Sequence, residues 1–229
     1  MRCETSGQTM ELKNIVAAFE KEFSQLTHLK VGKWITEAEA KKLSHSLQRK
    51  ILATRWVVVQ KPSKVRARIV AKDFRACGLS SLREGHYSPT ASLEALRLLL
   101  AMAETYQWSL CTLDISTAFL YAELDKEERQ PICFPTSTLS ATGERLHLQL
   151  EKALYGLRRA PLAWYRQLVG ALASLGFKPT SESTVMRFEL SDPSKFLLVL
   201  IYVDDLLITG CHETIQWATQ QLGKQFRPM

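Results

Sequence analysis

The spacing of apolar residues changes along the chain, and it predicts an alternation of strands and helices. Apolar runs rich in Val, Ile and Leu, such as residues 55–59 and 196–201, are typical of buried strands. In residues 92–107 and 161–176 the apolar positions recur three or four residues apart, which indicates helices. Because antiparallel strands and helices are mixed in this order, the sequence predicts an α+β fold.

The first fifty residues differ from the rest of the chain. Residues 11–49 are mostly polar and compatible with helix, with apolar residues only at isolated points. We therefore expect residues 1–50 to form a polar helical leader that packs on the edge of a main domain, residues 51–229.

A β-hairpin is predicted early in the main domain. Residues 55–59 and 65–72 are rich in strand-forming residues and flank the turn Lys61-Pro-Ser-Lys64. Side chains alternate between the two faces of a strand, so Arg66 and Arg68 are expected on one face and the apolar residues between them on the other. The remaining elements are expected in this order: a helix capped by Ser92 that runs to about Gln107, a strand at 109–114, a helix from Pro161 to Gly176, strands at 186–190 and 195–202 around a turn at 191–194, and a helix at 213–222.

Two adjacent carboxylates stand at the tip of an apolar hairpin, in Tyr202-Val-Asp-Asp205. Such an Asp pair is usually a solvated turn or a helix cap. Here the flanking strands are apolar, and two desolvated carboxylates repel each other unless they are paired or bound to metal. Mg²⁺ takes one or two carboxylates together with substrate phosphates. The pair therefore suggests phosphoryl transfer on nucleotides.

Asp114 supplies a third carboxylate at the end of the apolar strand 109–114. A two-metal site needs carboxylates that bridge both ions, and residues from the ends of different strands often meet in one site. The alternative is that Asp114 caps the helix that follows it.

Composition sets broad limits on the function. The chain has 229 residues, 46% of them hydrophobic, and a net charge of +7, which allows one or two globular domains and suits a polyanionic partner. The five cysteines are scattered without a C-x-x-C pair, which is typical of a reduced intracellular chain without a zinc site or disulfide framework. No signal peptide or membrane-spanning run is visible, so we expect neither secretion nor membrane insertion. The five dispersed histidines are expected on the surface.

Three ordered blocks give the chain a family resemblance: residues 113–120 (Leu-Asp-Ile-Ser-Thr-Ala-Phe-Leu), 154–164 (Leu-Tyr-Gly-Leu-Arg-Arg-Ala-Pro-Leu-Ala-Trp) and 202–208 (Tyr-Val-Asp-Asp-Leu-Leu-Ile). Together with Arg66-Ala-Arg-Ile-Val-Ala-Lys72, they resemble the reverse transcriptase of copia-type (Ty1/copia) long-terminal-repeat retrotransposons. The resemblance covers roughly residues 51–226. The tetrapeptide Tyr202-Val-Asp-Asp205 alone would be a weak signal, whereas three blocks in the right order are specific.

The resemblance implies a right-hand polymerase of which the fingers and palm are present, with an antiparallel palm sheet packed on helices. The chain ends before the place of the family's thumb and RNase H domain, so the thumb is expected to be missing. The implied function is RNA-directed DNA polymerase: addition of dNTPs to a primer 3′-hydroxyl on an RNA or DNA template. The implied location is intracellular, in a cytoplasmic retroelement particle or in the nucleus.

The resemblance also implies a set of site residues. Asp114, Asp204 and Asp205 would hold two Mg²⁺ ions, for which Mn²⁺ could substitute, and the carbonyl of Ile115 could add a ligand. Phe119 matches the steric gate that selects deoxynucleotides. The residues that match the nucleotide-contacting segments are Tyr155 and Gly156, beneath the incoming nucleotide, and Arg66, Arg68 and Lys72, on the basic strand that reaches the triphosphate.

Other interpretations stay open. On sequence alone Phe119 fits core packing equally well, the two arginines could form a solvated strand face, and which arginine meets the triphosphate is not fixed. The turn at residues 61–64 is shorter than in many relatives, and the glycine usually found after Ala-Phe-Leu is absent. The rival functions are a truncated or domesticated remnant that binds nucleic acid without polymerase activity, and an RNA-dependent RNA polymerase, against which Phe119 argues.

Overall fold

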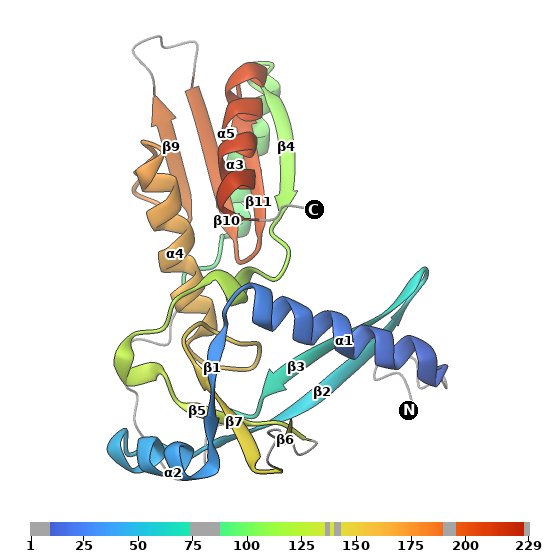
Figure 1. Cartoon of the computed structure of the whole chain (residues 1–229). Coiled ribbons are helices and arrows are strands. Elements are labelled where there is room, and N and C mark those ends of the chain that lie inside the picture. The colour runs from blue at the N-terminus through green and yellow to red at the C-terminus, as the bar shows by residue number, and fades with distance from the viewer. Residues whose placement is uncertain (1–9, 74–87, 136–137, 140–142, 190–195, 227–229) are drawn as a thin grey trace. The chain divides into compact units, whose positions relative to one another are not determined.

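The computed structural model describes residues 10–73, 88–135, 138–139, 143–189 and 196–226. The chain forms two compact units: unit 1 comprises residues 1–83 and 119–163, and unit 2 comprises residues 84–118 and 164–229. Each unit has its own β-sheet with helices packed on it (Figure 1), so the fold is mixed α/β. None of the helices in the described ranges has both the length and the apolar character needed to cross a bilayer.

The sheet of unit 1 has the strand order β1-β7-β5-β2-β3, with β6 paired to β7. The strand β5 pairs with β2 in parallel, and the other pairings are antiparallel. The β2–β3 pair is the predicted hairpin, and β3 forms an edge of the sheet. The strands are β1 (Gly32–Thr36), β2 (Leu52–Lys61), β3 (Lys64–Ala71), β5 (Pro131–Cys133), β6 (Thr138–Leu139) and β7 (Arg145–Leu150).

One face of the β2–β3 hairpin is covered by the helix α1 (Leu12–His28), which lies along it in Figure 1. Ile15 and Ala18 of α1 pack with Val58 and Ala67 in a buried cluster. The predicted alternation along β3 is therefore confirmed: its apolar residues face α1, and Arg66 and Arg68 lie on the other face of the strand.

The first fifty residues contain the two helices α1 and α2 (Glu37–Ser46), with the strand β1 between them. The helix α2 begins with a capping box, in which the Thr36 side chain accepts from the backbone of Glu39 and the Glu39 side chain accepts from the backbone of Thr36. The strand β1 forms because residues 32–36 pair with β7 far along the chain. Local spacing carries no sign of that partner.

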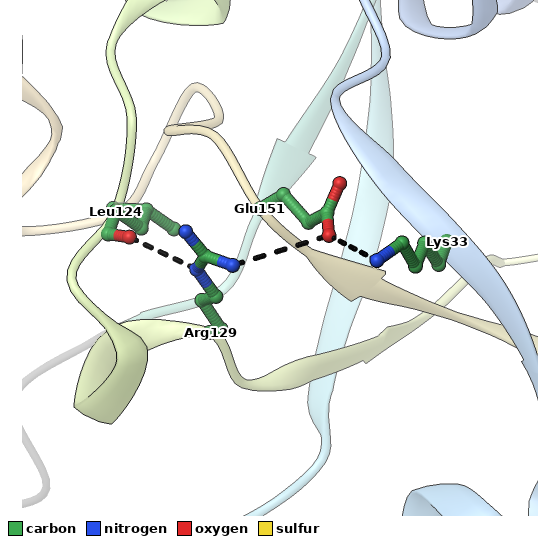
Figure 2. A network of polar contacts seen from close by, with 4 residues as sticks. All are labelled: Lys33, Leu124, Arg129 and Glu151. Atoms are coloured by element: carbon green, nitrogen blue, oxygen red, sulfur yellow. Dashed lines mark hydrogen bonds and ion pairs between the residues drawn. The ribbon is translucent and has the colours of Figure 1, made fainter.

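A polar network also joins this leader to the rest of unit 1 (Figure 2). Lys33 of β1 forms an ion pair of 2.8 Å with Glu151, directly after β7. Arg129 lies 4.0 Å from the same carboxylate and donates from Nε to the carbonyl of Leu124 at 3.0 Å. The Lys33 side chain, with smaller contributions from other cations, lowers the pKa of Glu151. These contacts tie β1 and the segment at 124–129 to the end of β7.

The sheet of unit 2 is antiparallel, with the order β4-β11-β10-β9-β8. Leu198 and Leu200 of β10 pack against Leu99 of α3 on one face. On the other face, Trp217 of α5 stacks on Phe188 with 4.9 Å between ring centroids. The elements are α3 (Leu93–Thr105), β4 (Ser109–Asp114), α4 (Ala160–Ser174), β8 (Lys178–Pro179), β9 (Val185–Glu189), β10 (Phe196–Tyr202), β11 (Asp205–Gly210) and α5 (His212–Gln225).

The strong local signals in unit 2 predicted its elements well. The Ser92 side chain caps α3 by accepting from the backbone N–H of Ala95 at 3.1 Å, and Gly176 follows α4 with φ of 94°. The predicted strand at 109–114 is β4, and the carboxylate hairpin is β10–β11. The predicted turn at 191–194 lies outside the described residues. The strands β5, β6 and β8 were not predicted, since they have too few residues to show a period. The longer strand β7 was not predicted either, although its leucines alternate with polar residues.

One surface prediction is wrong. His147 of β7 is only 4% exposed, and burial lowers its pKa because the charged imidazolium loses its hydration. The alternating pattern of β7 does not reveal this burial, because the residues two positions away on the same face, Arg145 and Gln149, are less buried than His147.

Candidate active site

The two adjacent carboxylates lie in a tight turn, as predicted. Tyr202 and Asp205 are opposite each other in the β10–β11 ladder, so only Val203 and Asp204 form the loop. Val203 has φ of 58°, which is costly for a β-branched residue and needs support from its surroundings. That support comes from Trp164, whose buried indole N–H donates to the carbonyl of Val203 at 2.7 Å. The hydrogen bond from α4 thus stabilises the conformation of the turn.

Asp114 reaches the same end of the unit 2 sheet. The strand β4 pairs with β11 in the register that puts Asp114 directly opposite Asp205. One residue further on, the backbone N–H of Ile115 donates to the carbonyl of Asp204 at 3.0 Å. The next helical segment, a 3₁₀ turn, begins only at Ala118, so Asp114 does not take its N-cap position. The structure therefore brings the backbones of the three predicted aspartates and of Ile115 to the same end of the unit 2 sheet.

The electrostatics of this group favour a bound cation. Asp205 is exposed but has lost part of its hydration, which raises its pKa, and the negative charges of Asp204 and Asp114 raise it further. Like charges opposite each other on neighbouring strands destabilise a sheet, and a divalent ion would offset that repulsion. The donors are carboxylate oxygens, which Mg²⁺ prefers. Within the described ranges, no three His, Cys, Asp or Glu side chains lie close enough together to hold a metal ion. The donor chemistry fits magnesium, but the side chains are not gathered around a common point.

A second group of predicted residues lies in unit 1. The guanidinium of Arg68 lies over the Tyr155 ring, 4.4 Å from its centroid, which is a cation–π contact. Tyr155 in turn meets Phe119 edge to face, with ring centroids 5.5 Å apart. We call Arg68, Tyr155 and Phe119 the aromatic–arginine cluster. Arg66 lies on the same face of β3, and Lys72 is exposed just after the strand.

Gly156 lets the loop after Tyr155 approach the end of β3 closely. The backbone N–H of Ala71 donates to the carbonyl of Tyr155 at 2.8 Å. Gly156 has φ of 84°, and a Cβ atom there would lie 2.2 Å from the carbonyl oxygen of Ala71. Further along, Arg158 donates to the Asp73 carboxylate from its backbone N–H at 3.1 Å and from Nε at 3.3 Å. The loop and the basic strand are therefore joined, and Arg68 lies over Tyr155 as a consequence.

Comparison with known proteins identifies the family. A model of the family described as reverse transcriptase (RNA-dependent DNA polymerase) matches residues 41–228. The chain belongs to this family. Its relatives include retrotransposon polyproteins of the copia type, so the predicted copia-type reverse transcriptase domain is confirmed.

Three relatives illustrate the match. The retrovirus-related Pol polyprotein from transposon RE1 of Arabidopsis thaliana is 31% identical over 172 residues, or 72% of this chain. The corresponding polyprotein from transposon TNT 1-94 of Nicotiana tabacum is 30% identical over 149 residues, or 64% of the chain. The truncated transposon Ty1-A Gag-Pol polyprotein of Saccharomyces cerevisiae is 24% identical over 204 residues, or 86% of the chain. The chain spans only 11%, 11% and 16% of these relatives, respectively.

The region matched to the reverse transcriptase family contains both groups of candidate residues, whereas α1 precedes it. The ordered motifs pointed to these residues from the sequence. They did not point to the hydrogen bond of Trp164 or to the Asp73–Arg158 pair, since each joins residues that are distant in the chain. The tryptophan is the last residue of the quoted block 154–164, but the block itself gives no sign of its hydrogen bond to Val203.

Proposed function

We propose that this chain carries the nucleotidyl-transfer machinery of a copia-type reverse transcriptase and extends a primer with deoxynucleotides on an RNA or DNA template. The observation that supports this most is the placement of Asp114 opposite Asp205, beside the turn that holds Asp204. Under this proposal the unit 2 sheet is the palm, and the β2–β3 hairpin belongs to the fingers. The division into a leader at 1–50 and a fingers–palm part at 51–229 remains part of the proposal.

Asp114, Asp204 and Asp205, with the carbonyl of Ile115, would hold the Mg²⁺ ions, which Mn²⁺ could replace. Bound there, the metal would supply activation of the primer 3′-hydroxyl and neutralisation of triphosphate charge. The protein's own part is to present these oxygens on a turn fixed by Trp164. The Asp205 side chain is exposed and those of Asp114 and Asp204 are only half-buried, so they can rotate toward a common ion without unpacking the core.

In unit 1, Arg66, Arg68 and Lys72 would bind the triphosphate. Arginine suits phosphate because its planar fork donates two parallel hydrogen bonds, and lysine provides a point charge. The Phe119 ring would exclude a ribose 2′-hydroxyl. Its edge contact with Tyr155 restricts its rotation, which a steric gate requires, and Gly156 keeps Tyr155 in place.

The test is primer extension on an RNA template with Mg²⁺ and dNTPs, comparing the wild-type chain with Asp204→Asn. The control is Asp125→Asn, which makes the same change at an exposed aspartate of unit 1 that belongs to none of the three motifs. We expect extension by the wild-type and control chains, and loss of extension with Asp204→Asn. Extension by all three chains would refute the role of Asp204.

Two further comparisons separate the rival functions. Phe119→Ala is expected to admit ribonucleotides, and equal use of both nucleotides by the wild-type chain would remove the gate assignment. A folded wild-type chain that binds template–primer without extending it would favour the nucleic-acid-binding remnant instead. Binding of that kind would weaken steeply with salt, because it releases counterions from the phosphates.

A further inference from the structure

The helix α1 lies outside the region matched to the family, yet it packs directly on the edge strand that carries the two arginines. An edge strand presents backbone groups that no other strand satisfies. At Ile69 of β3 the unmet N–H group donates to a side chain of α1 instead, to Oε1 of Glu22 at 3.2 Å. Glu22 therefore takes the place of a neighbouring strand at this point.

Glu22 is an unusual residue for that position, because it is only 3% exposed. Burial raises its pKa, while the Ile69 N–H group and the positive charges of Arg68 and Arg66 lower it. A buried carboxyl group is costly unless it is hydrogen-bonded, and so is a buried backbone N–H. Each group here satisfies the other, which makes the contact specific: a shorter side chain would leave both without a partner.

The position of this contact links it to Arg68. Ile69 follows Arg68 directly, and Arg68 on the opposite face of β3 lies over the Tyr155 ring. The strand is therefore fixed from both sides, by Glu22 at the backbone of Ile69 and by Tyr155 at the side chain of Arg68. A shift of the Ile69 backbone would carry the Arg68 guanidinium away from the ring.

We propose that Glu22 is a positioning residue for the nucleotide triphosphate: through its hydrogen bond to Ile69, α1 holds the edge strand so that Arg68 meets the phosphates. The inference rests on the proposed role of Arg68 and extends the nucleotide site to a helix outside the matched region. It also commits to Arg68 as the arginine in question, since it is the one that contacts Tyr155.

The experiment measures dTTP binding to the full chain by calorimetry, with Mg²⁺ and without primer, so that no turnover is needed. Glu22→Asp keeps the charge but is one methylene too short to reach Ile69. Glu22→Gln keeps the reach and the acceptor oxygen but removes the charge. We expect dTTP binding to be about five- to tenfold weaker with Glu22→Asp, because that variant loses the hydrogen bond that positions Ile69. With Glu22→Gln we expect binding close to that of the wild-type chain. Amide exchange at Ile69 should accelerate only with Glu22→Asp.

Two controls make the result specific. Glu20→Asp is the same change at an exposed site on α1 and should leave dTTP binding unchanged. In an Arg68→Ala background Glu22→Asp should weaken binding no further, whereas a general structural defect would add to the first loss.

The opposite order, with weak dTTP binding by Glu22→Gln and normal dTTP binding by Glu22→Asp, would overturn the inference. The charge of Glu22, and not its hydrogen bond to Ile69, would then control binding. Additive losses would overturn it as well. A folded wild-type chain that does not bind dTTP would overturn both this inference and the role of Arg68. Primer extension by that same chain would leave the proposed polymerase function standing.

Discussion

Replacing Gly156 by alanine tests how closely the loop after Tyr155 must approach the end of β3. The added methyl would lie 2.2 Å from the carbonyl oxygen of Ala71 and 2.6 Å from a methyl of Val70. Carbon and oxygen atoms at ordinary contact are more than 3 Å apart, so the loop must withdraw by about 1 Å. That movement would lengthen the 2.8 Å hydrogen bond from Ala71 to the Tyr155 carbonyl beyond bonding range.

The expected cost has two parts. A non-glycine residue in the left-handed region costs about 1–2 kcal/mol, partly offset by the lower entropy of the unfolded chain. The second part, about 1–3 kcal/mol, comes from the lost hydrogen bond of Ala71 and from the close contact between the new methyl and the Ala71 carbonyl oxygen, which the loop cannot fully relieve. Gly143→Ala provides the matched control, since Gly143 has φ of 78° and nothing within 4 Å of its would-be Cβ atom. It isolates the backbone part, so the difference between the two variants should be about 2 kcal/mol.

The assay is urea unfolding of the two variants and the wild-type chain, followed by circular dichroism. The free energies can be compared if the dependence on urea concentration stays the same. We also expect weaker dTTP binding for Gly156→Ala alone, because withdrawal of the loop separates Tyr155 from Arg68. Equal destabilisation by the two alanine substitutions would refute the close approach of the loop to β3.

Three further predictions concern other residues. Trp164→Phe should destabilise the chain by about 1–3 kcal/mol in urea unfolding, since it removes the hydrogen-bond donor to Val203, and it should also slow primer extension. The control is Trp217→Phe, at a half-buried ring stacked on Phe188, which should leave extension unchanged. Asp205→Asn should raise the melting temperature in the absence of metal, because the raised pKa of Asp205 marks a carboxylate that is destabilised by partial loss of hydration and by its charged neighbours. Added Mg²⁺ should stabilise the wild-type chain and not this variant, and a wild-type melting temperature that does not change with Mg²⁺ would contradict the metal assignment. The lowered pKa of His147 means that the folded state favours the neutral ring, so the stability that this preference contributes is present above about pH 6.5 and is lost as the pH falls below it. Between pH 7.5 and 5.5 the free energy of unfolding in urea should therefore decline less for His147→Leu than for the wild-type chain.

Local sequence signals predicted the elements that depend on local physics. The Ser92 cap, the turn between β2 and β3, and the apolar strands around Asp204 each depend on a few neighbouring residues, and each was found in the structure. The site residues came from ordered motifs, and the structure brings Asp114, Asp204 and Asp205 to one end of a sheet. Their roles in metal binding and catalysis remain predictions.

The features that were missed all depend on partners far away in the chain. The strand β1 exists because β7 is available to pair with it, and His147 is buried by what packs around β7. The hydrogen bonds of Glu22 and Trp164 join helices to a strand edge and to a turn that no spacing rule connects to them. A one-dimensional pattern carries no information on such pairings.

These distant contacts have the same physical effect: each stabilises a backbone conformation that the motif residues alone would not maintain. Val203 has a positive φ in the turn beside Asp204, and the hydrogen bond from Trp164 offsets part of that strain. Ile69 has a backbone donor at a sheet edge, and Glu22 satisfies it. Motifs of this family can therefore be intact in a chain whose supporting residues have changed, and such a chain would keep the carboxylates and lose their geometry. Glu22→Asp and Trp164→Phe create that situation deliberately, one in each unit, with every motif carboxylate and arginine left in place. If both variants kept wild-type nucleotide binding and extension, the motif residues would be sufficient and the supporting contacts would serve stability alone.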